Sequence, residues 1–585
     1  MAFGYEFVTL TEPEKEQRRH LLDLYATVAQ WSALGVFALF QFYFLLSWLA
    51  GSDAETERPK SPFQQHAKVK GTSWTRKTQQ ALRRVFWWAG KSVRNGWGTR
   101  GEWIVGMAWT SWLLLLSIYR TGNDYLHLTK RLGMVGVSQL PLHYLLAMRS
   151  PYSPVQLLTR LSHEQLKVSH QILGRILCLL FGLHACLYLN FFVQAGIFVK
   201  RIKDLDVIMG IMSITIFSIL STTALETLRR WNYRVFYTTH IILASLLIYP
   251  LFFHVKHIRP YVMEVFVVIL LHQIFRNYSL RRYSGTVSLI RGTNLVQIRI
   301  PLILLDKEMK WKVGQHVYLS RPTGVSPSFS SYETFVLRNR TNPFTIASLP
   351  AKDKQLLLVA RTLNGNTKKL AELGRSLSAH IEAGEPSPSI PMVLEGPYGA
   401  SARLPDFSTF DRILLVAGGV GATFVLPIYR SIVEYEGASR SPSPQVRFVW
   451  AVRKLAETQW AFPPLDQDQP ELDSAIIDNL VEVCVTRPLG PDLEAEYDGE
   501  DIELAEAEQL IPLEDEMEKP RRGMTIRSGR PDMFAIVNEA FGKSTGRVAV
   551  LVCGPQGMTE ELRGYVGSWV SQGRDVYWHS ETFGW

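Results

Sequence analysis

The chain has 585 residues, of which 47% are hydrophobic and 20% are charged, and its formal net charge is +10 at pH 7. This length leaves room for several domains. The basic residues lie mainly beside long apolar runs, which indicates membrane topology and argues against a nucleic-acid partner. The four cysteines lack the spacing of a disulfide framework or a zinc site, so we expect neither. They are Cys178, Cys186, Cys484 and Cys553.

Before residue 280 the sequence contains seven apolar stretches that are candidate membrane spans, so we expect the protein to lie in a lipid membrane. The third stretch is the weakest candidate because it contains Gln139, Pro141 and His143. The seven stretches cover residues 24–50, 103–120, 131–148, 168–194, 205–226, 235–255 and 261–275.

The loops between these stretches differ in positive charge. Arginine and lysine are denser in the loops 51–102, 149–167 and 227–234 and in the segment after residue 275 than in the other loops. Because basic loops stay on the cytosolic side, these segments and the C-terminal region are predicted to be cytosolic. The N-terminus is then expected on the far side of the membrane.

Two histidine pairs with the same spacing lie in the fourth and sixth stretches. His170 and His184 are fourteen residues apart, and so are His240 and His254. In a helix this interval spans roughly 21 Å and returns to nearly the same face. Two such helices side by side would present facing imidazoles at two levels of a bilayer core about 30 Å thick. Imidazole is a common haem ligand, so the pattern predicts two bis-histidine haems, with ordinary core histidines as the alternative.

Three further residues near these histidines have two interpretations each. Arg175 lies inside the fourth stretch, where it either extends its charge to the interface or meets an anionic partner such as a haem propionate. Gly174 and Gly182 either let a flat ring approach the backbone or serve helix packing.

After residue 280 the sequence pattern changes to strands and mixed α/β segments. Alternating residues with glycine turns first predict a small antiparallel barrel. Apolar strands separated by helical segments then predict a doubly wound parallel sheet. The interval from about 491 to 530 is strongly acidic and poor in aromatic residues, so we expect a disordered insertion there.

Three glycine-containing motifs follow one another in this second half. Residues 394–399 read LEGPYG, residues 416–428 read VAGGVGATFVLPI and residues 552–558 read VCGPQGM. In the second motif a buried strand enters a glycine turn and then a helix, so that backbone N–H groups can face a phosphate or a nicotinamide ring. The three motifs in this order are more specific than any one of them.

With the spaced histidines, these motifs make the chain resemble the ferric reductase and NADPH oxidase superfamily from about residue 103 to 585, and most of all its short fungal metalloreductases. The resemblance implies a membrane domain that binds two haems b, followed by a cytosolic module of the ferredoxin-NADP reductase type that binds FAD and NADPH. The predicted domains are an N-terminal span and basic loop at 1–102, the haem domain at 103–280, the FAD barrel at 281–405 and the NADP domain at 406–585.

The resemblance also implies which residues contact FAD. Residues 342–348 read NPFTIAS, where the family has a His-Pro-Phe-Thr-x-x-Ser motif, so Asn342 replaces a histidine that can titrate. Arg361 resembles the flavin-phosphate arginine. Trp585 resembles the aromatic C-terminus that covers the flavin ring. The implied FAD contacts are Pro343, Phe344, Thr345, Ser348, Arg361, Gly365, Thr367 and Trp585.

On the nicotinamide side, the family's motifs match the second and third glycine motifs. Arg453 follows a strand at a place where a 2′-phosphate could be read, with Lys454 beside it, which favours NADPH over NADH. The implied NADPH contacts are Gly418, Gly419, Gly421, Thr423, Arg453, Cys553, Gly554 and Pro555.

The resemblance implies an oxidoreductase in the plasma membrane or endoplasmic reticulum that passes electrons from cytosolic NADPH through FAD and two haems to ferric or cupric ion on the far side. One alternative is an NADPH oxidase that reduces dioxygen to superoxide. A second alternative is a degenerate haem-binding membrane protein without catalysis, which the substitution at Asn342 keeps open. The four histidines His170, His184, His240 and His254 are the predicted iron ligands in each case.

Overall fold

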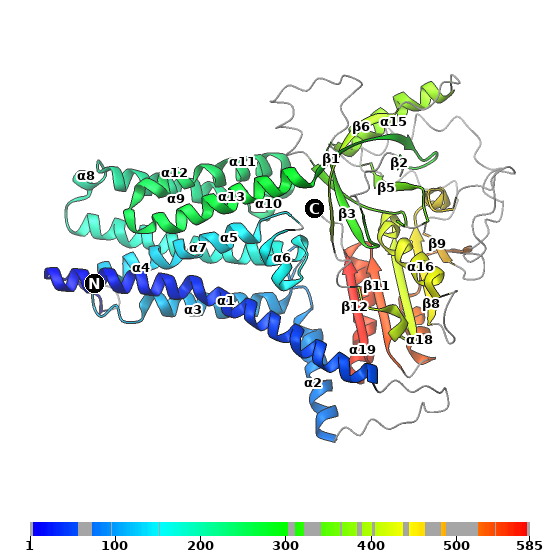
Figure 1. Ribbon diagram of the computed structural model, residues 1–585, viewed down its shortest axis with the longest axis horizontal. Helices are drawn as coiled ribbons and strands as arrows, with labels where there is room; N and C mark the ends of the chain where they lie inside the picture. The colour runs from blue at the N-terminus through cyan, green and yellow to red at the C-terminus, as the bar shows by residue number, and fades with distance from the viewer. Residues whose placement is uncertain are drawn as a thin grey trace. The chain divides into compact units, whose positions relative to one another are not determined.

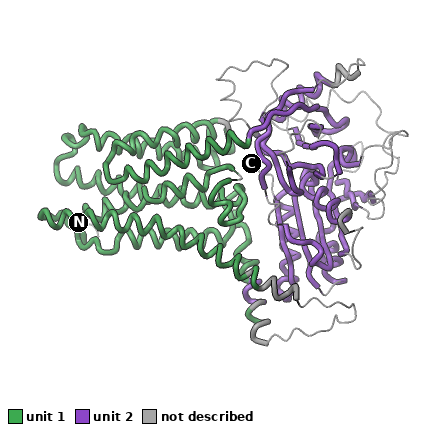
Figure 2. The backbone as a smooth tube through the Cα atoms, viewed as in Figure 1, with its two compact units in different colours: residues 1–79, 85–279 green, residues 80–84, 280–585 purple. Residues whose placement is uncertain are grey.

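The computed structural model describes most of the chain, and its contacts divide the chain into two units (Figure 2). The first unit is residues 1–79 with 85–279, and the second is residues 80–84 with 280–585. The described residues are 4–56, 73–94, 96–150, 152–301, 310–320, 341–350, 352–362, 366–382, 389–399, 404–436, 444–462, 481–486, 524–543 and 546–581.

The first unit consists of helices that run side by side (Figure 1). The apolar faces of α1, α3, α4, α5, α7 and α13 share one core. The helices are α1 (Glu12–Thr56), α2 (Ser73–Ala89), α3 (Arg100–Ile118), α4 (Tyr125–Ser138), α5 (Leu140–Leu146), α6 (Pro154–Thr159), α7 (His163–Gln194), α8 (Phe198–Arg201), α9 (Leu205–Thr223), α10 (Glu226–Trp231), α11 (Tyr233–Leu246), α12 (Ile248–His254), the 3₁₀ turn η3 (Lys256–Ile258) and α13 (Arg259–Ser279).

Among the described residues, six helices are long and apolar enough to cross a membrane. They begin at Glu12, Arg100, His163, Leu205, Val235 and Lys256. The third predicted span, 131–148, is instead divided between α4 and α5. The two helices meet at Gln139, and Pro141 lies in the first turn of α5, where its missing N–H cannot continue the hydrogen bonding of α4. The residues that weakened the sequence prediction are therefore where the helix breaks.

The sixth predicted span, 235–255, is also interrupted. It consists of α11 and α12, which meet at Leu247. Pro250 lies in the first turn of α12 and has no N–H to donate to Leu246. His240 therefore lies on α11 and His254 on α12, two segments of one broken helix.

The loops of the first unit gather at two ends. At one end the N-terminal segment bonds to the start of α4, with Glu6 N–H donating to Asn123 O at 2.8 Å, and Phe7 contacts Phe191 near the end of α7. At the other end Trp97, before α3, donates through Nε1 to Glu226 of α10 at 2.8 Å. The helix pair α4–α5 runs between these ends, so it crosses the unit as a seventh, broken passage.

In the second unit, the first sheet is an antiparallel barrel with strand order β4-β3-β6-β1-β2-β5. A bridge between Ile346, just after β4, and Leu358 of β5 closes it. Inward-facing apolar residues of every strand form its core, and α15 (Asn366–Glu382) covers β1 and β2. The strands are β1 (Leu280–Leu289), β2 (Leu295–Pro301), β3 (Gln315–Ser320), β4 (Thr341–Thr345), β5 (Gln355–Arg361) and β6 (Ile390–Gly399).

The second sheet has six strands, all parallel, in the order β10-β9-β8-β7-β11-β12. Alternate residues of β7 pack with α16 (Ala422–Glu436), while α18 (Met533–Gly542) and α19 (Gln556–Ser571) pack on each other. The barrel and the doubly wound sheet are the architecture that the sequence predicted. The strands are β7 (Arg412–Gly418), β8 (Gln445–Val452), β9 (Val481–Val485), β10 (Met524–Ser528), β11 (Val548–Cys553) and β12 (Val576–Glu581).

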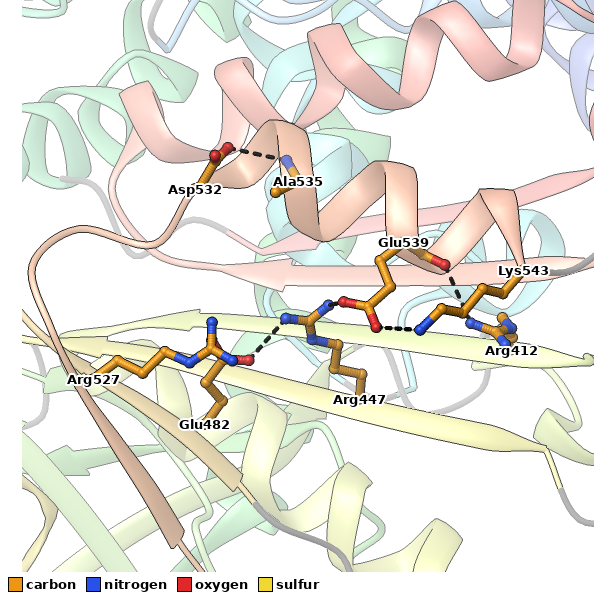
Figure 3. Close-up of polar contacts among 8 residues, drawn as sticks. All are labelled: Arg412, Arg447, Glu482, Arg527, Asp532, Ala535, Glu539 and Lys543. Atoms are coloured by element: carbon orange, nitrogen blue, oxygen red, sulfur yellow. Dashed lines mark hydrogen bonds and ion pairs between the residues drawn. The ribbon is translucent and has the colours of Figure 1, made fainter.

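The predicted acidic insertion, 491–530, extends too far. Residues 524–528 form β10, which pairs with β9 at the edge of the sheet. Arg527 of β10 contacts Glu482 of β9 at 3.1 Å, and Glu482 also contacts Arg447 of β8 at 2.9 Å (Figure 3). The acidic residues before Met524 lie outside the described residues.

Candidate functional site

The structure brings the four predicted histidines together as two pairs. The ring centroids of His170 and His240 are 6.3 Å apart, with the ring planes at 72°. Those of His184 and His254 are 6.5 Å apart, with the planes at 89°. Because α7 carries one member of each pair and α11–α12 carries the other, the common fourteen-residue spacing places the pairs at two levels.

Three of these four imidazoles donate a hydrogen bond to a backbone carbonyl. Nδ1 of His170 lies 3.1 Å from the carbonyl oxygen of His143. The corresponding distances are 2.7 Å from His184 to Thr129 and 2.6 Å from His254 to Asp206. A carbonyl oxygen only accepts, so Nδ1 carries the proton and Nε2 keeps its lone pair. This arrangement is typical of imidazoles that bind a metal through Nε2.

The spacing within each pair suits one metal atom between two imidazoles. A metal–imidazole bond of about 2 Å on each side separates the two nitrogens by about 4 Å. The ring centres lie farther apart by one ring radius on each side, close to the separations in both pairs. Among the described residues there is no cluster of three or more histidine, cysteine or carboxylate side chains that would hold a free metal ion. Two facing imidazoles are a donor set that fits a metal whose other ligands come from a macrocycle such as haem.

Small residues that the sequence interpretation missed face the second pair. A Cβ at Gly133 of α4 would lie 2.7 Å from the His184 ring, and a Cβ at Gly210 of α9 would lie 2.6 Å from the His254 ring. Any side chain there would displace the imidazole. Of the two glycines singled out in the sequence, Gly174 lies against His143, because a Cβ there would lie 3.2 Å from His143 Cε1, whereas a Cβ at Gly182 would meet no other residue within 4 Å.

Arg175 lies beside two tryptophans. Its guanidinium carbon is 4.8 Å from the ring of Trp97 and 5.1 Å from that of Trp103. The two indoles stack at 5.9 Å, and Nε1 of Trp103 donates to Trp97 O at 2.9 Å. Cation–π contacts therefore hold this charge at one end of the helical unit, a partner that the sequence interpretation did not include.

The predicted nucleotide motifs meet at the carboxyl ends of β7 and β11. A Cβ at Gly418 would lie 2.6 Å from Pro555, and one at Gly421 would lie 2.1 Å from Cys553 O, so the two turns touch. Gly419 has φ +53° and open space beside it. β7 lies where the strand order reverses direction, which is where ligands bind in sheets of this kind. The N-terminus of α16 begins directly after this turn and favours an anion.

Two predicted nucleotide contacts have side chains that point into the protein. The Thr423 hydroxyl donates to Val420 O at 2.8 Å and so closes the turn before α16. The Cys553 side chain is fully buried, and burial raises the pKa of its thiol, which therefore stays protonated at neutral pH. These two side chains therefore support the turn from the inside, whereas Gly419 has open space beside it.

Arg453 follows β8, as the sequence predicted, and the structure places it on the surface. Its backbone N–H donates to the Glu457 carboxylate at 3.4 Å. Burial raises the pKa of Glu457, while the charges of Arg361 and Arg453 oppose that rise. Glu457 is thus a half-buried carboxyl that interacts with the predicted flavin arginine and with the predicted nucleotide arginine, and sequence reasoning missed it.

The predicted flavin residues lie on β4, β5 and the start of α15. Thr345 ends β4 and Arg361 ends β5, and the bridge that closes the barrel brings these strands together. Phe344 packs inside the barrel. The Ser348 hydroxyl accepts the N–H of Leu357 at 3.0 Å, so it also braces the closure. Thr367 is buried in the first turn of α15, Pro343 lies in β4 beside Asn342, and Gly365 and Trp585 lie outside the described residues.

An aromatic and acidic group near the end of the chain was also missed. His579 of β12 stacks on Phe424 of α16, with centroids 5.5 Å apart, and its Nε2 lies 3.2 Å from the Glu581 carboxylate. Both residues lie toward the carboxyl end of β12, beside β11 and Cys553. From this C-terminal segment the sequence analysis singles out Trp585 alone.

A helical unit of membrane-spanning length, an antiparallel barrel and a doubly wound sheet together define a membrane-bound oxidoreductase. Three family models match this chain: a ferric reductase like transmembrane component at residues 132–251, an FAD-binding domain at 281–402 and a ferric reductase NAD binding domain at 410–567. The chain belongs to the ferric reductase superfamily, and its second half holds FAD- and nicotinamide-binding domains.

Curated relatives from fungi align over most of the chain. The probable metalloreductase AIM14 of Scheffersomyces stipitis is 23% identical over 504 residues, which is 82% of this chain and 86% of that protein. The AIM14 of Yarrowia lipolytica is 26% identical over 501 residues, 78% of this chain and 86% of that protein. The ferric reductase transmembrane component 3 of Saccharomyces cerevisiae is 23% identical over 457 residues, 75% of this chain and 58% of that protein.

Proposed function

We propose that this protein is a transmembrane NADPH-dependent metalloreductase, which uses FAD and two haems b to reduce ferric or cupric ion on the far side of the membrane. The observation that carries the proposal is the pair of histidine levels, with centroids 6.3 and 6.5 Å apart, in a membrane unit joined to a flavin and nicotinamide module. The names of the fungal relatives support a metal ion as the acceptor.

The chain's own residues bind and orient the cofactors. His170 with His240, and His184 with His254, would hold one haem each through Nε2, because the proton on Nδ1 is fixed by a carbonyl in three of the four. The glycine turns at Gly419 and Gly554 would receive the nicotinamide nucleotide, with Arg453 beside its 2′-phosphate. When bound, FAD accepts a hydride and releases single electrons, and haem passes single electrons.

The proposal places the second unit in the cytosol and the protein in the plasma membrane or endoplasmic reticulum. NADPH is a cytosolic donor, and the basic loops 51–102 and 227–234 lie on the same side as that unit in the predicted topology. The His170/His240 level is then the inner one, and the His184/His254 level is the outer one.

An anaerobic reduction experiment tests this function. Purified protein loaded with FAD and haem is mixed with NADPH without oxygen, and haem absorption is followed. We expect a low-spin Soret band that shifts on reduction and then reverts when a ferric chelate is added. Protein that binds haem and flavin but shows no haem reduction by NADPH would instead be the non-catalytic alternative.

The same preparation separates metal from dioxygen as the acceptor. Ferric chelate and oxygen are added separately to the reduced protein, and superoxide is measured in the second arm. Fast reoxidation by the chelate under anaerobic conditions supports a metalloreductase. Reoxidation by oxygen alone, with superoxide formed, would assign the oxidase alternative and contradict the proposal.

A further inference from the structure

A fifth histidine lies against one member of the first pair. The ring of His143, on α5, stacks on that of His170 with centroids 3.9 Å apart and planes at 11°. The backbone carbonyl of the same residue accepts the hydrogen bond of His170 Nδ1 at 3.1 Å. One residue therefore contacts both the face and the edge of the His170 imidazole.

The break between α4 and α5 places His143 there. Gln139 ends α4 and is fully buried, and its side-chain oxygen accepts from Trp109 Nε1 at 3.3 Å. After the break, Tyr144 donates its hydroxyl to Ala244 O of α11 at 2.6 Å, which ties α5 to the helix that carries His240. On α7, Gly174 leaves room for the His143 ring, as its missing Cβ would lie 3.2 Å from Cε1.

The second pair has no equivalent residue among the described contacts. His184 also donates to a carbonyl, that of Thr129, but its ring meets Tyr188 edge-on at 5.1 Å. His254 donates to Asp206 O. Among the described residues, a second imidazole stacks parallel on His170 and on none of the other three histidines, so the two levels differ in how firmly they fix ring rotation.

We propose that His143 is a positioning residue that fixes the rotation of the His170 imidazole and thereby tunes the haem held by His170 and His240. The proposal rests on the haem ligation proposed above. The carbonyl sets the tautomer, and the stacked ring blocks rotation about the bond between Cβ and the ring of His170, so that Nε2 keeps one direction. The Nδ1 atom of His143 is buried and has no hydrogen-bond partner among the described residues, so this ring is held by packing.

Four variants of the full-length, haem-loaded protein test the role. His143→Ala removes the ring and keeps the carbonyl, while His143→Phe keeps a flat ring without nitrogen. Gly174→Ala presses on the His143 ring from α7. Gly182→Ala is the matched control on the same helix, because the added methyl group would meet no other residue within 4 Å. For each variant, the low-temperature EPR g values and the midpoint potentials of the two haems are measured, and the signals are assigned with His254→Ala, which lacks a ligand of the second pair.

We expect His143→Ala to shift the g values of the His170/His240 haem, because the His170 ring can then rotate. The midpoint potential should fall, because water can enter the space left by the His143 ring and stabilises the charged ferric state. Gly174→Ala should shift the same signal less. The His184/His254 signal should stay at its wild-type position in both, and His143→Phe and Gly182→Ala should match the wild type at both haems. If His143→Ala loses the first haem altogether, the positioning role is judged from Gly174→Ala, in which a smaller shift of the same signal is expected.

Several outcomes would overturn the positioning role. They are wild-type spectra and potentials in both His143→Ala and Gly174→Ala, or an equal shift of both haems. A His143→Phe variant as defective as His143→Ala would mean that the imidazole itself is needed, as a ligand would be. If the wild-type protein itself contains no low-spin haem, the proposed function is refuted. That outcome is distinct from failure of the positioning role, which is seen only in the variants.

Discussion

At the scale of single residues, the orientation of the paired histidines depends on backbone carbonyl oxygens. Three carbonyl oxygens set the tautomers of His170, His184 and His254. The Nδ1 atom of His240 is buried and has no partner among the described residues. We infer that His240 is the least constrained of the four, so that a haem bound as proposed would set its orientation.

The glycines that face the second pair give a prediction. Gly133→Ala and Gly210→Ala each place a methyl group 2.6–2.7 Å from a ligand ring, closer than two carbons can approach. We expect bound haem to fall from two per chain toward one, with the His170/His240 signal retained. Quantified haem per chain and the redox titration check this, and Gly182→Ala is the control. Two haems in both variants would contradict the assignment of His184 and His254.

The nucleotide arginine gives a second residue-scale prediction. Arg453→Ala should weaken NADPH by about 1.5–3 kcal/mol, the usual value of hydrogen bonds to a charged group, or roughly 10–100-fold in KM. NADH, which has no 2′-phosphate, should be nearly unaffected. Glu457→Gln should strengthen NADPH binding, because it removes a carboxylate whose charge interacts with that of Arg453. Steady-state reduction with both nucleotides measures this, and equal effects on both would remove the 2′-phosphate role.

At the scale of elements, the broken helices are the informative ones. Both breaks have a proline in the first turn of the following helix. His143 follows the first break, and the second break separates His240 from His254. In the parallel sheet, the short edge strand β10 is mostly exposed and is held by pairing with β9 and by the ion pair of Arg527 with Glu482. Its position therefore depends on Glu482, which contacts Arg447 and Arg527.

This network gives an element-scale prediction. Arg447 joins Glu482 of β9 to Glu539 of α18, at 2.9 and 2.6 Å (Figure 3). The Glu482 side chain is only 12% exposed, so Glu482→Gln leaves two arginines without their shared carboxylate and should lower the free energy of unfolding by about 1–3 kcal/mol. Thermal unfolding followed by flavin fluorescence measures this.

Lys543→Ala is the matched control for that network. It removes an ion pair of Lys543 with the same Glu539, in which the lysine side chain is 63% exposed. Exposed pairs contribute little, so the change should stay within about 0.5 kcal/mol. A loss as large as that of Glu482→Gln would mean that burial does not govern the strength of these contacts.

At the scale of the whole molecule, topology depends on whether α4–α5 counts as a crossing. Six long helices alone would leave both termini on one side of the membrane. The N-terminal segment, however, bonds to the start of α4, and the loops at Trp97 and Glu226 gather at the opposite end of the helical unit. The broken pair therefore runs the length of the helical unit, where the third apolar stretch of the sequence predicted a span.

This gives a prediction about the termini. Small epitope tags at the two ends should lie on opposite sides, with the N-terminal tag outside and the C-terminal tag in the cytosol. Antibody or protease access before and after selective permeabilisation of the plasma membrane measures it. Tags on the same side would mean that α4–α5 does not cross.

Much of this architecture could be predicted from sequence because it rests on periodic patterns. The equal spacing of His170–His184 and His240–His254 predicts two levels without any knowledge of the neighbours, and the barrel and parallel sheet follow from alternating and apolar runs. The proposed role of His143 could not be predicted, because His143 is 27 residues from His170 and does not share the fourteen-residue spacing of the pairs. Gly133 and Gly210 look like ordinary packing glycines, and β10 follows an acidic segment that conceals it.

One shared residue has a consequence for the outward-facing level. Asp206 offers its carbonyl to His254, while its carboxylate contacts Arg201 at 3.4 Å on the surface of the helical unit. A few covalent bonds thus separate a partly exposed ion pair from the half-buried imidazole of His254, a proposed haem ligand. Under the proposed function, a change in ionic strength or a charged ligand at that surface would act, through the Asp206 backbone, on the residue that holds the outer haem.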